Sequence, residues 1–226
     1  MNRRYSRNLS AISLRENDAL SHFRVFVAGC GGIGGFVIEE LGRLGIGHIT
    51  AVDGDVFDET NLNRQILSTL SVMGKSKSAE AKMRMSDVNP YVAVRPLHMT
   101  ITEENCRNLV CGHDLVIDAL DNVACRFVLG DACQEENIPM IHGAISGWCG
   151  QVSVVFPGDD TLKKLYPERA GRDVPLNPGS PPFTPAVIAS IEVAETVKVL
   201  LGRGNLLRNK LLIIDLLLHD YEVISL

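Results

Sequence analysis

Short apolar runs alternate with longer segments that carry apolar residues at helical spacing along the first two-thirds of the chain. The apolar runs predict β-strands over 24–28, 48–52, 92–97, 114–120, 139–144 and 151–156. The periodic segments predict helices over 33–44, 75–88, 103–110 and 126–136. Because strands and helices alternate and the strands are apolar on both faces, the pattern predicts a parallel sheet covered by helices on each side.

The pattern changes after Phe156, where prolines and glycines recur from Pro157 to Pro185 and predict no regular element. So long a loop inside a compact domain is usually functional, so we expect a crossover loop over 157–185 that passes over a ligand site. A helix over 186–201 and two closing strands over 210–216 and 221–226 are predicted to follow.

The predicted fold is therefore a Rossmann-like, doubly wound α/β fold. Its sheet is expected to be mainly parallel with antiparallel closing strands. The length of 226 residues suits a single domain over 1–226, in which 1–23 form an N-terminal arm.

A glycine turn lies between the first predicted strand and the first predicted helix. Gly29, Gly31 and Gly34 have the spacing G-x-G-x-x-G, and Gly32 lies among them. Glycine permits a sharp turn and lets backbone N–H groups approach a phosphate without a Cβ atom in the way. Asp53 ends the next apolar run, about 20 residues later, where a ribose-binding carboxylate belongs. Together these residues predict an adenine-nucleotide site.

Polar donors follow this aspartate at Asn61, Asn63, Arg64 and Gln65. The guanidinium of arginine is a rigid fork of donors that suits phosphate oxygens. The segment therefore favours a nucleoside triphosphate over a nicotinamide dinucleotide. A polar surface turn with no ligand is the alternative interpretation.

Two further charged residues extend the candidate site. Lys77 begins a predicted helix, where a cation opposes the helix dipole unless an anion lies nearby, so we expect a phosphate there; Lys75 competes for the role. Asp121 follows the most apolar predicted strand, at the sheet edge where open α/β folds bind ligands. Its carboxylate is predicted to hold Mg²⁺ against phosphate oxygens. Asp118 is expected to point into the sheet or to cap a helix instead.

Composition and charge exclude several classes of protein. A net charge of −5 argues against nucleic acid as the main partner. The basic N-terminus lacks the apolar stretch of a signal peptide, and the apolar run over 211–218 is too short to span a bilayer, so a cytoplasmic protein without a membrane segment is predicted. The cysteines show no C-x-x-C spacing, so no zinc site is expected, and Cys149 is favoured as a small residue lining the site rather than a nucleophile.

The order of these motifs along nearly the whole chain resembles the MoeB/ThiF/HesA family of ubiquitin-activating-enzyme-like adenylyltransferases. The resemblance rests on the opening R-Y-S-R, followed by G-C-G-G-I-G, V-D-G-D, N-L-N-R-Q, G-K-S-K, D-A-L-D-N and Arg126. The segment N-L-N-R-Q is the most specific of them, because ordinary dinucleotide-binding folds lack it.

The resemblance implies an enzyme that uses ATP and Mg²⁺ to adenylate a carboxylate, usually the C-terminal glycine of a small β-grasp, ubiquitin-like sulfur-carrier protein. It implies a homodimer in which Arg7 reaches into the ATP site of the partner subunit. The other roles that it implies are the ribose for Asp53, the phosphates for Arg64 and Lys77 with Asn61 and Gln65 nearby, and Mg²⁺ for Asp121.

Two departures from the family pattern keep alternatives open. The paired C-x-x-C motifs that typically hold zinc are missing, and the crossover loop contains no cysteine for a thioester or persulfide step. The acceptor could therefore be a small-molecule or tRNA-bound carboxylate, or the chain could be a non-catalytic scaffold subunit. A NAD-dependent oxidoreductase is disfavoured, because the donor-rich segment has no role there.

Overall fold

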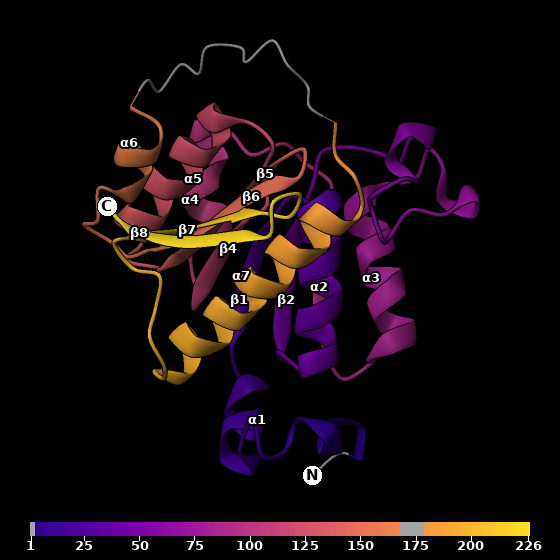
Figure 1. Cartoon of the computed structure of the whole chain (residues 1–226). Coiled ribbons are helices and arrows are strands. Elements are labelled where there is room, and N and C mark those ends of the chain that lie inside the picture. Colours follow the sequence, from indigo (N-terminus) through magenta and orange to yellow (C-terminus); the bar gives the residue numbers. More distant parts are fainter. Residues whose placement is uncertain (1–2, 168–178) are drawn as a thin grey trace.

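The structure is a computed structural model, and it describes residues 3–167 and 179–226. A single mixed sheet forms its middle layer (Figure 1). The strands run in the spatial order β3-β2-β1-β4-β5-β6-β7-β8. Their bounds are β1 Arg24–Ala28, β2 His48–Val52, β3 Ala93–Leu97, β4 Leu115–Asp118, β5 Met140–Ser146, β6 Cys149–Val155, β7 Lys210–Asp215 and β8 Asp220–Ser225.

Helices cover both faces of this sheet (Figure 1). Their bounds are α1 Leu14–Leu20, α2 Gly32–Leu44, α3 Lys77–Val88, α4 Glu103–Val110, α5 Val123–Glu135, α6 Thr161–Leu165 and α7 Phe183–Leu201. Short 3-10 helices lie over Arg3–Asn8, Glu59–Asn61 and Leu70–Val72.

The strand pairing confirms the predicted fold class. The strands β3, β2, β1, β4 and β5 pair in parallel, whereas β6, β7 and β8 continue the sheet in antiparallel pairs. The strand order reverses between β1 and β4, since β2 and β3 lie on one side of β1 and β4 and β5 on the other. In such sheets ligands bind at the carboxyl ends of the strands beside this reversal.

Side chains that alternate along the central strands pack into two separate hydrophobic cores, one on each face of the sheet. Val25 and Val27 of β1 face α2, α3 and α7 and belong to one apolar cluster. Phe26 and Ala28 of the same strand face α4 and α5 and belong to the other. Because both faces are buried, β1 is apolar at nearly every position, as its sequence indicated.

Local capping moves several helix starts from their predicted positions. The helix α3 begins at Lys77 because the Ser76 hydroxyl accepts from the backbone N–H of Ala79. The helix α5 begins at Val123, before the predicted Arg126, because the Asn122 side chain accepts from the N–H of Cys125 at 2.8 Å. In both cases a polar side chain replaces a missing intrahelical bond and fixes the boundary.

The expectation that 157–185 contains no regular element is wrong at both ends of the segment. The helix α6 forms over Thr161–Leu165, and α7 begins at Phe183. Leu162 of α6 packs so closely on Gly130 of α5 that a Cβ atom at residue 130 would lie 2.6 Å from it. Tertiary packing therefore stabilises a helix too short to form alone. The middle of the predicted crossover loop lies outside the described residues.

The N-terminal arm packs at the amino ends of the parallel strands. The Tyr5 ring lies against Gly45, which ends α2 with a positive φ of 90°, and the Tyr5 hydroxyl accepts from the Asn89 side chain at 2.8 Å. The arm lies below the sheet in Figure 1, far from the start of α2. Arg7 is exposed there.

In the part of the chain that the structure describes, no helix combines the length and the apolar character needed to cross a bilayer. The cytoplasmic location stays a prediction.

Replacing Gly34 by alanine is expected to destabilise the fold by about 1–3 kcal/mol, because the new Cβ atom has no space. It would lie 1.9 Å from the backbone oxygen of Gly29, which the turn cannot move without opening. Urea unfolding followed by circular dichroism measures the change.

Gly35→Ala on the same helical turn is the matched control. Its Cβ would lie 3.4 Å from Ile66 and Leu67, and alanine is favoured over glycine in a helix by about 1 kcal/mol. Equal losses of stability in the two variants would contradict the close approach of α2 to the turn.

Candidate active site

A cavity of about 590 Å³ opens at the carboxyl ends of the parallel strands, a volume in the range of ligand-binding sites. The turn after β1, the end of β2 and the loop after β4 all contribute to its wall. The structure brings most of the predicted site residues together there, namely Gly29, Gly31, Gly32, Asp53, Arg64, Gln65, Lys77 and Asp121.

Asp53 is fixed against the glycine turn. Its Oδ2 atom accepts from the backbone N–H of Cys30 at 2.7 Å, and its Oδ1 atom accepts from the N–H of Asp55 at 2.8 Å. Each carboxylate oxygen accepts more than one hydrogen bond, so both keep capacity for ribose hydroxyls. The carboxylate is thus held in place before any ligand arrives.

Lys77 has an anionic partner within the chain. Its ammonium lies 3.1 Å from the Asp55 carboxylate, and its backbone N–H donates to the carbonyl of Asp55. The lysine side chain is 8% exposed and that of Asp55 is 77% exposed. The helix-dipole argument for a phosphate is therefore weaker than the sequence indicated, because Asp55 already supplies negative charge. Lys77 nevertheless lines the cavity, and Asp55 is free to move toward solvent.

Arg64 and Gln65 approach the glycine turn from a separate segment. Arg64 is partly buried and donates from Nη1 to the carbonyl of Thr60 and to Asn63 Oδ1. Gln65 is buried, its amide faces Gly31, and its Oε1 atom has no hydrogen-bond partner within the described residues. A buried amide oxygen without a hydrogen-bond partner lowers the stability of the fold, and a ligand that donates a hydrogen bond to it would remove this cost.

Two predicted site residues, Asn61 and Gly34, lie behind the cavity wall rather than along it. The Asn61 side chain accepts from the backbone N–H of Asp58, and its carbonyl accepts from the N–H groups of Arg64 and Gln65. Asn61 therefore shapes the segment that carries those two donors. Its direct contact with a nucleotide stays a prediction, as does that of Gly34.

Asp121 and Arg126 lie at the cavity on the loop and helix that follow β4. Arg126 is buried and donates from Nη2 to the carbonyl of Leu120 at 2.6 Å. Asp118 is fully buried and accepts from the N–H of Leu120 and from His142. It therefore points into the fold, which is the first of the two expectations stated for it. Asp121 is exposed and is thus the carboxylate available to Mg²⁺.

Sequence reasoning missed the polar residues beneath this loop. His142, Gln151 and Tyr166 converge on Arg126 and Asp118 from β5, β6 and the end of α6. Burial lowers the pKa of His142 despite the Asp118 carboxylate, and burial raises the pKa of Tyr166. The signal in the sequence was a histidine and a glutamine inside otherwise apolar strands, whereas nothing local marked Tyr166.

Glu192 of α7 is fully buried beside Gly143, and neither of its carboxylate oxygens has a hydrogen-bond partner within the described residues. Burial raises the pKa of this carboxyl well above its usual value, and the negative charge of Asp118 adds to the shift. The protonated acid is the form that such an apolar site tolerates.

Neither Cys30 nor Cys149 carries a thiol with a lowered pKa. Burial raises the pKa of Cys30 in the glycine turn, and desolvation and Asp215 raise the pKa of Cys149. Both shifts disfavour the thiolate, which is the nucleophilic form. Within residues 3–167 and 179–226, no three histidine, cysteine or acidic side chains cluster as a metal site.

Residues 5–226 match the model of the ThiF family. The chain belongs to the ThiF family. The sequence resemblance to the MoeB/ThiF/HesA group is thereby confirmed.

Several curated members of the ThiF family cover almost all of this chain. The SAMP-activating enzyme E1 of Haloferax volcanii is 32% identical over 98% of this chain and 84% of its own length. The sulfur carrier protein adenylyltransferase of Thermus thermophilus is 33% identical over 98% and 86%. The molybdopterin-synthase adenylyltransferase of Escherichia coli is 29% identical over 99% and 92%. Other relatives are longer, and the chain spans 59% of the protein named probable adenylyltransferase/sulfurtransferase MoeZ of Mycobacterium tuberculosis.

Solved structures share the ThiF-family fold of this chain. Escherichia coli MccB with ATP has a TM-score of 0.83 and 23% identity, covering 100% of this chain and 71% of its own. MccB with MccA-N7isoASN has a TM-score of 0.86 and 22% identity, with 100% and 72% covered. At this identity the likeness establishes the fold.

Glu192→Gln is expected to remove a pH dependence of stability. The folded state keeps a proton on Glu192 that the unfolded chain releases above its usual pKa of 4.5, so the wild-type free energy of unfolding falls as the pH rises through the range above that value. In that pH range the free energy of unfolding of the variant should rise relative to that of the wild type by at most about 1.4 kcal/mol per pH unit.

Urea unfolding of both proteins at a series of pH values from 4.5 upward measures this difference. Glu195→Gln is the control on the same helix, because its carboxylate accepts from the N–H of Leu207 and pairs with Lys198. A constant difference between wild type and Glu192→Gln at all pH values would contradict the buried proton.

Proposed function

We propose that this protein is an ATP-dependent adenylyltransferase that activates the C-terminal carboxylate of a small ubiquitin-like carrier protein. The observation that supports it most is the cavity itself, where Asp53, Arg64, Lys77 and Asp121 surround the glycine turn. A ribose-binding carboxylate, two cations and a second carboxylate are the groups that a magnesium–nucleoside triphosphate requires.

In the proposed reaction a carboxylate oxygen of the acceptor attacks the α-phosphorus of ATP. A bond forms between that oxygen and phosphorus, the bond from phosphorus to the bridging oxygen breaks, and pyrophosphate leaves with the electron pair. The acceptor is already ionised at neutral pH, so no general base is needed. Catalysis then consists of positioning the groups and of stabilising negative charge on the phosphate oxygens.

The roles of the cavity residues follow from their chemistry. Asp53 would accept the ribose hydroxyls, and Arg64 and Lys77 would stabilise the phosphate oxygens. Asp121 is an exposed carboxylate on the cavity wall, which is the kind of ligand that Mg²⁺ takes alongside phosphates, and the ion would neutralise charge as pyrophosphate departs. Lys77 would exchange the Asp55 carboxylate for a phosphate, because Asp55 is largely exposed.

A carrier protein is the acceptor that we propose, for two reasons. Curated relatives are named as activating SAMP or as adenylyltransferases of a sulfur carrier protein. The cavity also extends along Ala144 and Ile145 toward the β5–β6 turn, where Trp148 is exposed and its ring packs on Phe183.

An apolar surface continues from this turn across the closing strands. The backbone N–H of Leu216 donates to the carbonyl of Trp148, which joins the β7–β8 turn to the β5–β6 turn. Tyr221 and Val223 are exposed on one face of β8, and Leu217 and Leu218 are exposed in the β7–β8 turn; the exposed Ile213 faces the other side of the sheet. Such a patch beside the cavity suits a partner protein whose C-terminal tail enters the site.

The reaction is proposed to end at the acyl-adenylate. No cysteine occurs between Gly150 and Leu226, and the pKa of Cys149 is raised by desolvation. The crossover segment and the closing strands therefore offer no thiol for a covalent thioester step.

We also propose a homodimer of single-domain subunits in which Arg7 serves the partner's site. Within its own subunit Arg7 lies at the amino ends of the strands, whereas the cavity lies at their carboxyl ends. A basic arm remote from its own anion site is consistent with a role across a two-fold interface.

Carboxylate-dependent exchange of labelled pyrophosphate into ATP tests the activity, with candidate carrier proteins that end in Gly-Gly as acceptors. Asp121→Ala and Lys77→Ala should each lower the exchange rate by about 10²-fold or more, because each removes charge stabilisation from the transition state. Titration calorimetry should show binding of Mg·ATP to the wild type.

Lys82→Ala is the control for the lysine variant, because this side chain lies on the exposed surface of α3. It should leave the exchange rate unchanged. Tight binding of NAD without binding of ATP would exclude the adenylyltransferase, and exchange with small acids alone would assign a small-molecule acceptor instead.

Mixing Arg7→Ala with Asp121→Ala subunits tests the shared site. A heterodimer would keep one intact site, with aspartate from one subunit and arginine from the other. Because random pairing makes about half of the dimers heterodimers and each has one intact site of its two, about one site in four should be active. Pyrophosphate exchange measures the recovery, and mass spectrometry verifies that heterodimers form. If verified heterodimers remain inactive, Arg7 does not act across the interface.

A further inference from the structure

We propose that Tyr166, at the end of α6, is a positioning residue for Asp121 and acts through Arg126. The catalytic part of this proposal rests on the proposed function, whereas its structural part does not. A ring of hydrogen bonds that an ion pair between Arg126 and Asp118 closes lies beneath the cavity and carries the inference. Nothing in the sequence motifs includes Tyr166.

Asp121 depends on its backbone for its position. Its side chain makes no hydrogen bond or ion pair within the part of the chain that the structure describes. Next to it, the peptide groups of Leu120 are held on both sides. The Leu120 N–H donates to Asp118 Oδ1 at 3.1 Å, and the Leu120 carbonyl accepts from Arg126 Nη2 at 2.6 Å. Whatever fixes Arg126 therefore fixes the loop that presents Asp121.

Tyr166 is the residue that fixes the far side of the Arg126 guanidinium. The hydroxyl oxygen of Tyr166 accepts from Arg126 Nη1 at 2.8 Å and from Gln151 Nε2 at 3.0 Å. Its own proton is directed at His142 Nε2, 3.2 Å away. Nε2 is an acceptor because the other imidazole nitrogen carries the proton. His142 Nδ1 lies 2.8 Å from an Asp118 oxygen and must donate to it.

The contacts close into a ring from Asp118 through His142, Tyr166 and Arg126 back to Asp118, whose Oδ2 lies 3.5 Å from Arg126 Nε. Burial lowers the pKa of His142, which favours the neutral imidazole that this arrangement requires. Every member except Tyr166 is at least nine-tenths buried, and Tyr166 is partly buried. A buried network of this kind is rigid while complete and is costly to break at one point.

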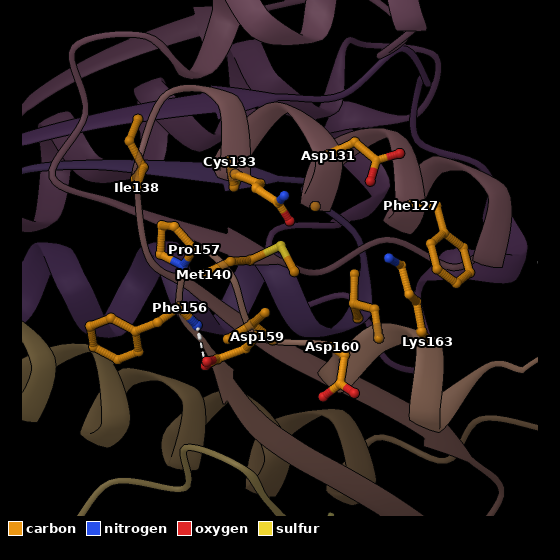
Figure 2. A pocket seen from close by; sticks show the side chains of 14 residues that line it. Phe127, Asp131, Cys133, Ile138, Met140, Phe156, Pro157, Asp159, Asp160 and Lys163 are labelled. Carbon is orange, nitrogen blue, oxygen red and sulfur yellow. Dashed lines mark hydrogen bonds between the residues drawn. The ribbon is translucent and has the colours of Figure 1, made fainter.

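The helix α6 holds Tyr166 at its end in a fixed place. Leu162 packs on Gly130 of α5, and Asp159, just before α6, accepts two hydrogen bonds from Arg208. Figure 2 shows the narrow crevice of about 40 Å³ between these helices, with Phe127 and Asp131 on one side and Asp160 and Lys163 on the other. This crevice is far too small for a nucleotide and marks a packed contact rather than a second site.

Tyr166 also lies two residues before the segment 168–178, which comes between α6 and α7 in the sequence. The ring therefore connects the loop that presents Asp121 to the start of the segment predicted to cross the site. A positioning role predicts a loss in the rate of the chemical step with little change in ATP binding, because a group displaced by about 1 Å costs on the order of 10²-fold in rate.

Tyr166→Phe tests the proposal, because it removes the hydroxyl and keeps the ring. In pyrophosphate exchange we expect kcat to fall about 10-fold or more while KM for ATP changes less than about 3-fold. Hydrogen–deuterium exchange without nucleotide or acceptor should show faster exchange in peptides that cover 119–122. The matched control is Arg84→Gln, which removes two hydrogen bonds between α3 and Glu39 of α2 but touches no member of the ring.

Arg84→Gln is expected to lower the melting temperature without a change in kcat or in exchange at 119–122. Gln151→Met removes the other donor to Tyr166 and should give a smaller effect of the same sign, which keeps the test decisive if Tyr166→Phe folds poorly. Unchanged exchange at 119–122 in both ring variants, Tyr166→Phe and Gln151→Met, overturns the proposal, as does an equal change in Arg84→Gln. If the wild type shows no adenylation but the ring variants loosen 119–122, the proposed function fails and the positioning role stands.

Discussion

The close contact between the loops after β1 and β4 is the constraint on which the site depends. These strands are parallel neighbours, so their carboxyl ends meet where the strand order reverses. A Cβ atom at Gly29 would lie 2.7 Å from the backbone oxygen of Ala119, and Gly29 has a φ of 95°. Glycine alone combines that conformation with that space. The contact places the glycine turn and Asp121 along the lining of one cavity.

Charge in this cavity is arranged with few fixed pairs. Asp53 is held by two backbone N–H groups and Lys77 by an exposed aspartate, whereas Asp121 has no side-chain partner within the described residues. Such groups change partners at little cost, which suits a site that must bind a polyanion and release pyrophosphate. Rigid support comes instead from beneath, where Asp118, Arg126 and His142 are buried and bonded to one another.

The buried polar groups divide into two kinds with different consequences. The ring beneath the cavity is held by hydrogen bonds and by the ion pair between Arg126 and Asp118, so burial there confers rigidity. Within the described residues, Arg126 Nε is the one ring atom that pairs by charge without a hydrogen bond. Glu192 lies close by on α7 without a hydrogen-bond partner in the described residues, so burial there shifts a pKa and makes stability depend on pH. The same apolar interior therefore fixes the loop that presents Asp121 and contains a carboxyl, Glu192, whose ionisation destabilises the fold.

The sequence by itself determined the fold class, the glycine turn and the position of Asp53 at the end of β2, because these depend on periodicity and on residues near one another in the chain. It also singled out Arg64, Lys77 and Asp121, which line one cavity in the structure and whose roles there stay predictions. Only the tertiary structure decided that Lys77 pairs with Asp55, that Asn61 lies behind the cavity wall, and that α6 forms within a proline-rich segment. It alone brought Tyr166 to Arg126. These features depend on contacts between residues far apart in sequence, whose geometry is set by packing and leaves no local pattern in the chain.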